Sequence, residues 1–185
     1  LTIIQQAAYG LDATLTKLLI SLSPQVAVEA ISDAPYELTP YLQAIIEEAT
    51  AAQLGQVLLE VKEVPAQITF RGGTVKEILS ILLSNALIHS GQNAATLRVA
   101  LTNWQDDFGL SFQVIDTGPG IPHELRKKIF ELFYEGGDFS ASPGKGMGLT
   151  VAKALSERLN GCLVLNEDDP NTCFELVVPA RPIAR

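Results

Sequence analysis

Residues 110–121 read LSFQVIDTGPGI and combine an apolar strand with a turn that contains two glycines. Gly118 and Gly120 permit a backbone with positive φ, so we expect Asp116 at the end of a strand, beside a tight turn. A second glycine cluster, GKGMGL at residues 144–149, comes just before a predicted helix, whose first N–H groups are unpaired and favour anions. Two glycine-rich turns joined by a glycine-rich loop over residues 134–147 predict a nucleotide held between them.

The composition is that of a folded, acidic chain. Of its 185 residues, 47% are hydrophobic and 18% are charged, a balance that disordered chains do not have. The net charge of −8, with no basic cluster to offset it, argues against a nucleic-acid surface. No apolar run approaches the roughly 20 residues of a membrane span, and no signal peptide is evident. Met147 is the only methionine, so we expect the chain to be a piece of a longer protein.

The two cysteines fall on adjacent strands of a predicted hairpin. A turn centred near Asp169 would place Cys162 near Leu176 and Cys173 near Leu165, which is out of register for a disulfide. Two free thiols suit a reducing compartment, and we therefore expect a cytoplasmic location.

The first part of the chain has a helical pattern of its own. Apolar residues recur at alternating intervals of four and three, the spacing of a bundle-type helix, at Ile4, Ala8, Leu11, Leu15, Leu18 and Leu22. An ordinary amphipathic surface helix is the alternative. Pro24 ends the pattern, and residues 24–38 are predicted to be an irregular linker. We therefore divide the chain into residues 1–35 and 36–185.

The second part alternates helices and strands. Thr39 and Pro40 predict the start of a helix that ends near Gly55. Residues 57–61 and 67–70 have strand patterns and are expected to pair with each other. The capping-box sequence TVKE at residues 74–77 predicts a buried helix that runs to about residue 90. Strands are predicted at 96–104 and 110–116, a short helix from Pro122, a helix over 148–160, and a hairpin formed by 162–166 and 172–178.

Asn85 lies in the middle of the apolar helix that follows the TVKE sequence. A polar amide in a buried helix needs partners, and a hydrogen bond to neighbouring backbone is the simplest one.

Four stretches stand in a fixed order: LLSNA at 82–86, DTGPGI at 116–121, IFELF at 129–133 and GKGMGL at 144–149. Together they resemble the N box, first glycine box, F box and second glycine box of the catalytic ATP-binding domain of sensor histidine kinases, in the superfamily of gyrase, Hsp90 and MutL. The resemblance covers about residues 36–179. It implies a two-layer α/β sandwich of the Bergerat type, with a mixed sheet covered by helices on one face. The N-terminal bundle-type helix resembles the second helix of the family's dimerisation and phosphotransfer hairpin.

The resemblance also assigns site residues. Asp116 would accept a hydrogen bond from the adenine amino group; the alternative is that it only caps its own turn. Asn85 would hold Mg²⁺ through its amide oxygen, with ATP as the nucleotide. The other implied ATP-binding residues are Gly118, Gly120, Ile121, Gly144, Lys145, Gly146, Met147, Gly148, Leu149 and Thr172. Phe130 and Phe133 would anchor the loop between the glycine boxes.

Three positions depart from the family pattern. Ile81 stands where these kinases often carry Asn and the related ATPases a water-activating Glu. Ile88 replaces a common lysine, and Glu135 replaces a common Arg or Lys. These changes remove charge from around the triphosphate, and Lys145 and His89 are the nearest replacements.

The resemblance implies a fragment of a sensor histidine kinase in two-component signalling. It would transfer the γ-phosphoryl group of ATP to a histidine outside this chain, because neither His89 nor His123 has a phosphoacceptor context. The implied partners are the phosphoacceptor helix, a second subunit in a homodimer and a response regulator, with no nucleic acid. Two alternatives remain: an anti-sigma-type serine kinase, and a degenerate nucleotide-binding domain that acts as a protein-interaction module.

Overall fold

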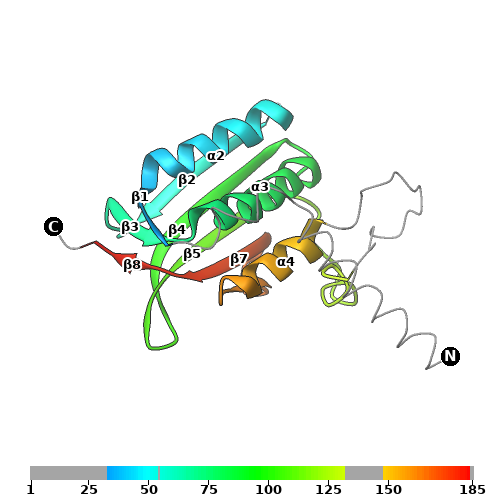
Figure 1. Ribbon diagram of the computed structural model, residues 1–185. Helices are drawn as coiled ribbons and strands as arrows, with labels where there is room; N and C mark the ends of the chain where they lie inside the picture. Colours follow the sequence, from blue (N-terminus) through cyan, green and yellow to red (C-terminus); the bar gives the residue numbers. More distant parts are fainter. Residues whose placement is uncertain (1–32, 54, 132–147, 184–185) are drawn as a thin grey trace, which may run out of the picture.

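The computed structural model describes residues 33–53, 55–131 and 148–183 (Figure 1). The predicted N-terminal helix and the loop at 134–147 therefore lie outside the described residues. The elements in chain order are β1 (Ala34–Glu37), α2 (Leu38–Gln53), β2 (Gln56–Lys62), β3 (Gln67–Phe70), α3 (Gly72–His89), β4 (Ala94–Trp104), β5 (Asp107–Asp116), α4 (Gly148–Arg158), β6 (Cys162–Leu165), β7 (Thr172–Pro179) and β8 (Arg181–Pro182).

The main sheet has five strands in the order β2-β4-β5-β7-β6. β2 pairs with β4 in parallel and the other neighbours are antiparallel, so the predicted mixed sheet is confirmed. The three helices of the described part lie together on one face of this sheet (Figure 1). This arrangement is the predicted two-layer α/β sandwich.

A second, small sheet has the order β1-β3-β8. Two predictions fail here. Residues 67–70 pair with β1 and β8 and not with β2, and residues 34–37 form a strand where we expected linker. The connection between β2 and β3 explains the first difference, because Glu63 has φ 49° and Pro65 follows, which turns the chain out of the main sheet. The carbonyl of Ala66 then accepts a hydrogen bond from the N–H of Leu38, at the start of α2.

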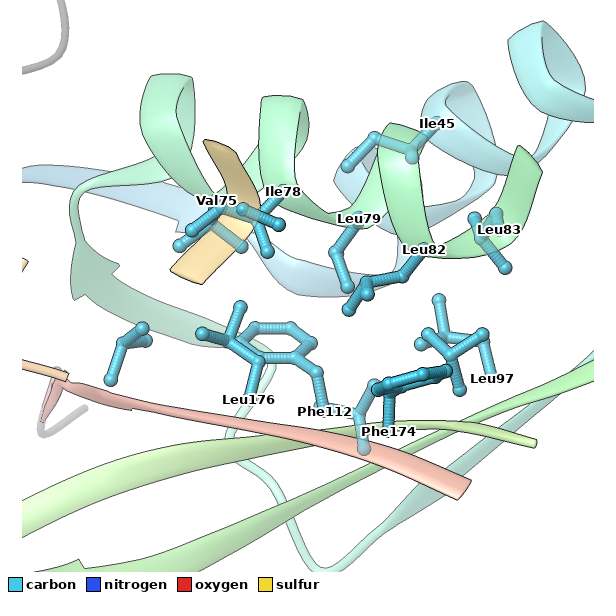
Figure 2. Packing of buried hydrophobic residues seen from close by; sticks show 14 of the residues in the cluster. Ile45, Val75, Ile78, Leu79, Leu82, Leu83, Leu97, Phe112, Phe174 and Leu176 are labelled. Carbon is cyan, nitrogen blue, oxygen red and sulfur yellow. The ribbon is translucent and has the colours of Figure 1, made fainter. Parts of the chain in front are cut away.

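The core lies between the main sheet and the helices (Figure 2). Alternate residues of β5, among them Phe112, point toward α3, whose apolar side chains Ile78, Leu79, Leu82 and Leu83 are fully buried. Burying each such side chain contributes roughly 1.5–3 kcal/mol, so this layer contact is the main source of stability. α3 is apolar over most of its surface because α2 and α4 cover its flanks.

The start of α3 is set by tertiary packing and not by the predicted capping box. The helix begins at Gly72, Arg71 occupies the N-cap position, and no side chain caps it. A Cβ on Gly72 would lie 2.4 Å from the Tyr36 ring, so only glycine fits there. The Tyr41 hydroxyl donates to the carbonyl oxygen of Gly72 at 2.7 Å, and burial raises the pKa of this hydroxyl, which keeps it a donor. α2 likewise begins at Leu38, one residue before the predicted cap Thr39.

Residues 123–130 form consecutive turns and not the helix predicted from Pro122. Several backbone bonds here span three residues, as between the N–H of Lys128 and the carbonyl of Leu125. A helix that started at Pro122 would use the carbonyl of Ile121 for its first internal bond. In the structure this carbonyl accepts from the side chain of Arg126 instead.

The far end of the molecule, away from the glycine turn, is closed by two short connections. β4 and β5 are joined by Gln105 and Asp106 alone, and the Trp104 indole N–H donates to the carbonyl of Asn160 at 3.0 Å. α4 ends at Arg158, two residues earlier than predicted, and Asn160 takes the left-handed conformation with φ 55°.

The final hairpin is shifted by one residue from the predicted pairing. Cys162 lies opposite Val177, and the N–H of Asn166 donates to the carbonyl of Cys173. Both cysteines are free, as predicted. Burial raises the pKa of the Cys173 thiol to about 12, so it is unreactive near neutral pH.

Candidate nucleotide-binding site

Asp116 and Thr172 meet at one end of the main sheet. They are opposite each other in the β5–β7 register, and both are buried, with Asp116 only 5% exposed. The Asp116 carboxyl accepts a hydrogen bond from the Gly118 N–H at 2.8 Å and another from the Thr172 side chain. Burial raises the pKa of Asp116, while these two hydrogen bonds and the nearby His89 oppose the rise. The predicted carboxylate at the end of a strand is confirmed, and it also caps its own turn.

The two glycines of the turn serve different purposes. Gly120 has φ +79° with open space around it, as the sequence predicts. Gly118 does not adopt a positive φ; it is needed for close packing instead. A Cβ on Gly118 would lie 2.6 Å from the carbonyl oxygen of His89 and 2.7 Å from Oδ1 of Asp116. The turn is thereby pressed against the end of α3.

The helical side of the site is formed by α3 and the first turn of α4. A Cβ on Gly148 would lie 3.2 Å from Cγ2 of Ile81 and 4.0 Å from Nδ2 of Asn85, so Asn85 faces the start of α4. Asn85 is partly exposed, and its side chain makes no hydrogen bond with the residues that the structure describes. The expected bond to neighbouring backbone is therefore not found among the residues that the structure describes.

These residues fit a magnesium ion that arrives with a nucleotide. The Asn85 oxygen is a hard ligand of the kind that Mg²⁺ accepts, but Mg²⁺ takes six ligands. Across the described ranges, no group of three or more His, Cys, Asp or Glu side chains could hold a metal. Phosphate oxygens and water would have to complete the coordination, which is the usual arrangement for Mg²⁺ with a triphosphate.

The F-box phenylalanine Phe130 is held by three contacts. Its ring packs edge-on against Phe174 at 6.2 Å, and the ammonium of Lys153 lies 4.9 Å from its centre. The Thr150 hydroxyl donates to the carbonyl of Phe130 at 3.0 Å, so the chain before the second glycine box is tied to the helix after it. Thr150 was missed by the sequence analysis, although its place directly after GKGMGL is a signal for it.

Ile121 and Leu149 are partly buried against the core on the two sides of the site. Of the two isoleucines that depart from the family pattern, Ile88 is 55% exposed and Ile81 lies beside Gly148. His89 is exposed but close enough to Asp116 to affect its pKa. The predicted residues that lie outside the described ranges are Phe133, Glu135, Gly144, Lys145, Gly146 and Met147.

A further pair near the site carries no sequence signal. Arg126 donates from Nε to the carbonyl of Ile121 at 3.1 Å and from a terminal nitrogen to Glu167 at 3.0 Å. These two side chains are 41 residues apart, so only the folded structure brings them together.

The chain is similar to known proteins in both sequence and fold. Residues 72–182 match the family model described as histidine kinase-, DNA gyrase B-, and HSP90-like ATPase. The aerobic respiration control sensor protein ArcB of Escherichia coli is 29% identical over 163 residues, which are 83% of this chain and 20% of ArcB. The chain thus spans a fifth of the length of this relative.

Two solved structures share the fold. The mycobacterial sensor histidine kinase MprB has a TM-score of 0.63 at 24% identity, with 82% of this chain and 100% of that chain covered. Full-length ShkA in complex with AMPPNP has a TM-score of 0.65 at 22% identity, with 93% of this chain and 37% of that chain covered. No helix in the described part has the length and apolar character that crossing a membrane requires. The matched family model covers well over half of the chain, which therefore belongs to the histidine kinase-, DNA gyrase B- and HSP90-like ATPases and has the fold of histidine kinase catalytic domains.

Proposed function

We propose that this domain binds Mg-ATP and transfers its γ-phosphoryl group to a histidine outside this chain. The observation that carries the proposal is the buried carboxylate of Asp116, opposite Thr172, at the same end of the domain as Asn85, which faces the start of α4. An ionised carboxylate can accept about four hydrogen bonds, so Asp116, which already accepts from Gly118 and Thr172, can also accept one from the adenine amino group. The ShkA structure, whose fold this chain shares, is a complex with AMPPNP.

Each residue has a distinct task in this proposal. Asp116 and Thr172 fix the base, and Asn85 contributes an oxygen to the magnesium ion. When bound, the ion neutralises charge on the phosphates. The start of α4 at Gly148 offers unpaired N–H groups, which attract anions. Phosphoryl transfer needs mainly positioning and charge neutralisation, so no further covalent chemistry is required of these side chains.

The partners follow from the same proposal. Because ArcB is named a sensor protein, we propose that the full protein senses a signal, dimerises, and passes its phosphoryl group to a response regulator. The phosphoacceptor histidine would lie upstream, on a helix that packs with the predicted bundle-type helix at residues 4–22. Use of ATP, together with free Cys162 and Cys173, supports a cytoplasmic location for the domain.

The first prediction tests Asp116. Asp116→Asn should weaken Mg-ATP binding at least about tenfold, because the amide presents its own N–H groups to the adenine amino group and one charge-assisted bond is lost. Isothermal titration calorimetry measures the affinity. Asp107→Asn is the matched control, because Asp107 is exposed at the other end of the same strand, and it should bind like the wild type. Equal affinities for all three proteins would remove Asp116 from the site.

One observation favours a second candidate, a degenerate nucleotide-binding domain that acts as a protein-interaction module and transfers no phosphoryl group. Ile88 exposes an apolar side chain beside the site where the family carries a lysine, and Ile81 fills the space next to Gly148. A longer chain that includes the upstream residues, incubated with γ-labelled ATP, decides between the two. Acid-labile label on a histidine supports the kinase, and its absence in a chain that binds ATP supports the degenerate domain.

A further inference from the structure

Arg126 joins two segments that border the site. Its Nε donates to the carbonyl of Ile121, the residue directly after the Gly118–Gly120 turn. Its terminal nitrogen donates to Glu167, in the loop that connects β6 to β7. Thr172, the partner of Asp116, stands at the other end of that loop. The Arg126 guanidinium therefore links the Gly118–Gly120 turn to the loop that leads to Thr172 at the start of β7.

The loop that holds Glu167 is itself well ordered by local hydrogen bonds. The Asn166 side chain accepts from the N–H of Asp168 at 3.1 Å, and the Asp169 carboxylate accepts from the N–H of Asn171 at 2.9 Å. The N–H of Asn166 donates to the carbonyl of Cys173 at 2.7 Å, which closes the loop onto β7. These bonds hold the backbone on both sides of Glu167, and Arg126 links this loop to Ile121.

On the other side of the bridge, Ile129 and Phe130 pack against the core, and the residues between Ile121 and Ile129 are held less firmly. Residues 123–130 are turns without a complete helical ladder, and Ile121 is only partly buried. The Arg126 and Glu167 side chains are 31% and 57% exposed, and such pairs add little to global stability. The rigid planar fork of arginine can make both bonds at once, which a lysine cannot do. This geometry suits local positioning better than overall stabilisation.

We propose that Arg126 is a positioning residue for the adenine end of the site, held by Glu167, and that it sets the affinity for adenine nucleotides without touching them. The inference rests on the proposed nucleotide binding. Loss of the bridge would release Ile121 and the glycine turn from the Thr172 side of the site. The affinities for ATP, ADP and adenosine should therefore fall by the same factor.

The experiment compares Arg126→Ala, Arg126→Lys and Glu167→Gln with a matched control, Arg71→Ala, in the full 185-residue chain. Arg71 also bridges a carboxylate and a backbone carbonyl, those of Asp33 and Arg158, with a similar side-chain exposure of 34%. It lies at the opposite end of α3 from the site. Calorimetry with ATP, ADP and adenosine gives the affinities, and hydrogen exchange of the unliganded proteins gives a readout that needs no nucleotide.

The expected pattern is specific. Arg126→Ala weakens the binding of all three ligands by about three- to tenfold, the range for one net hydrogen bond, and Arg126→Lys weakens it by less. Glu167→Gln changes the affinities little, because glutamine keeps a side-chain oxygen that can accept from Arg126. Arg71→Ala changes them little, because Arg71 lies at the other end of α3. Amides of residues 121–131 exchange faster in Arg126→Ala than in Arg71→Ala. Unchanged affinity in Arg126→Ala, or a loss for ATP much larger than for adenosine, overturns the inference while the proposed function stands. A wild-type chain that binds no adenine nucleotide refutes the proposed function and this role together.

Discussion

At the scale of single residues, burial of the ionised Asp116 carboxyl lowers the stability of the fold without ligand. Burial raises its pKa above the ordinary value of 3.8, so the folded state binds a proton more readily than the unfolded state. Stability therefore falls as pH rises through the interval between the two pKa values, and the penalty remains in full at neutral pH. A ligand that donates a hydrogen bond to the carboxylate relieves this penalty.

The second prediction follows from this fall of stability with rising pH. Without nucleotide at pH 7, Asp116→Asn should melt at the same temperature as the wild type or up to about 4 °C higher, since about 1 kcal/mol shifts Tm by about 2–4 °C in a domain of this size. The stability of the variant should also fall less steeply than that of the wild type as the pH rises. Calorimetric melts between pH 4 and pH 8, with Asp107→Asn as the control, measure both. A clear drop in Tm would show that the charge of Asp116 stabilises the fold.

The third prediction concerns Asn85. Asn85→Ala should bring the affinity for ATP in magnesium down to about the value measured with a chelator, because the only protein ligand proposed for the ion is lost. Its Tm should change little, since this side chain has no hydrogen bond to lose among the described residues and alanine favours a helix. Asn103→Ala, an exposed asparagine on β4, is the control. ATP binding that still responds fully to magnesium would place the ion elsewhere.

At the scale of elements, the end of α4 is set by close backbone packing. A Cβ on Gly161 would lie 2.4 Å from the carbonyl oxygen of Val177, which is backbone and cannot move aside. The fourth prediction is that Gly161→Ala destabilises the domain by about 1–3 kcal/mol in urea unfolding. Gly91→Ala is the comparison for strain without a close contact, because Gly91 has φ +71° and nothing within 4 Å, whereas Gly161 has no positive φ. A Gly161→Ala protein with the free energy of unfolding of the wild type would mean that the contact with Val177 is relieved at no cost.

The elements also separate what the sequence predicts from what it does not. The β5 strand, the Asp116 turn and the helix of Asn85 are confirmed because each has a local signal: alternation, glycine at a turn, or a long apolar helix. The predicted partner strand of residues 67–70 and the predicted start of α3 were wrong, because contacts between residues far apart in the sequence determine both. Tyr36 sets the start of the helix, and no local pattern at residues 74–77 contains that information.

At the scale of the whole molecule, the family and the layer order were accessible from four short boxes, while the fine geometry of the site was not. We expected Gly118 to adopt a positive φ, but glycine is required there because the backbone packs closely against the carbonyl oxygen of His89. The bridge of Arg126 depends on two segments that meet only after folding. The residue types thus predict which functional groups the site contains, and tertiary packing determines how these groups are positioned.

The fifth prediction concerns what the chain does alone. Ile81 packs beside Gly148, at the position where the related ATPases carry a general base, and such a base typically contributes about 10²–10⁴-fold to the rate. The pure chain should therefore release phosphate from ATP no faster than about the background rate, even at saturating nucleotide. A phosphate-release assay checks this, with Asn85→Ala as the background. Sustained release that depends on Asn85 would contradict the prediction.

The contact between Trp104 and Asn160 has a practical consequence for optical work. Trp104 is the only tryptophan, and it ties the β4–β5 hairpin to the end of α4 farthest from the site. The 11 residues of α4 separate the two ends by about 16 Å. Fluorescence excited selectively at Trp104 therefore reports detachment of that hairpin during unfolding, and we expect this emission to stay constant when a nucleotide binds at the other end. A flat fluorescence titration is the expected signal of a protein that binds its nucleotide, and a labelled nucleotide is the probe to use.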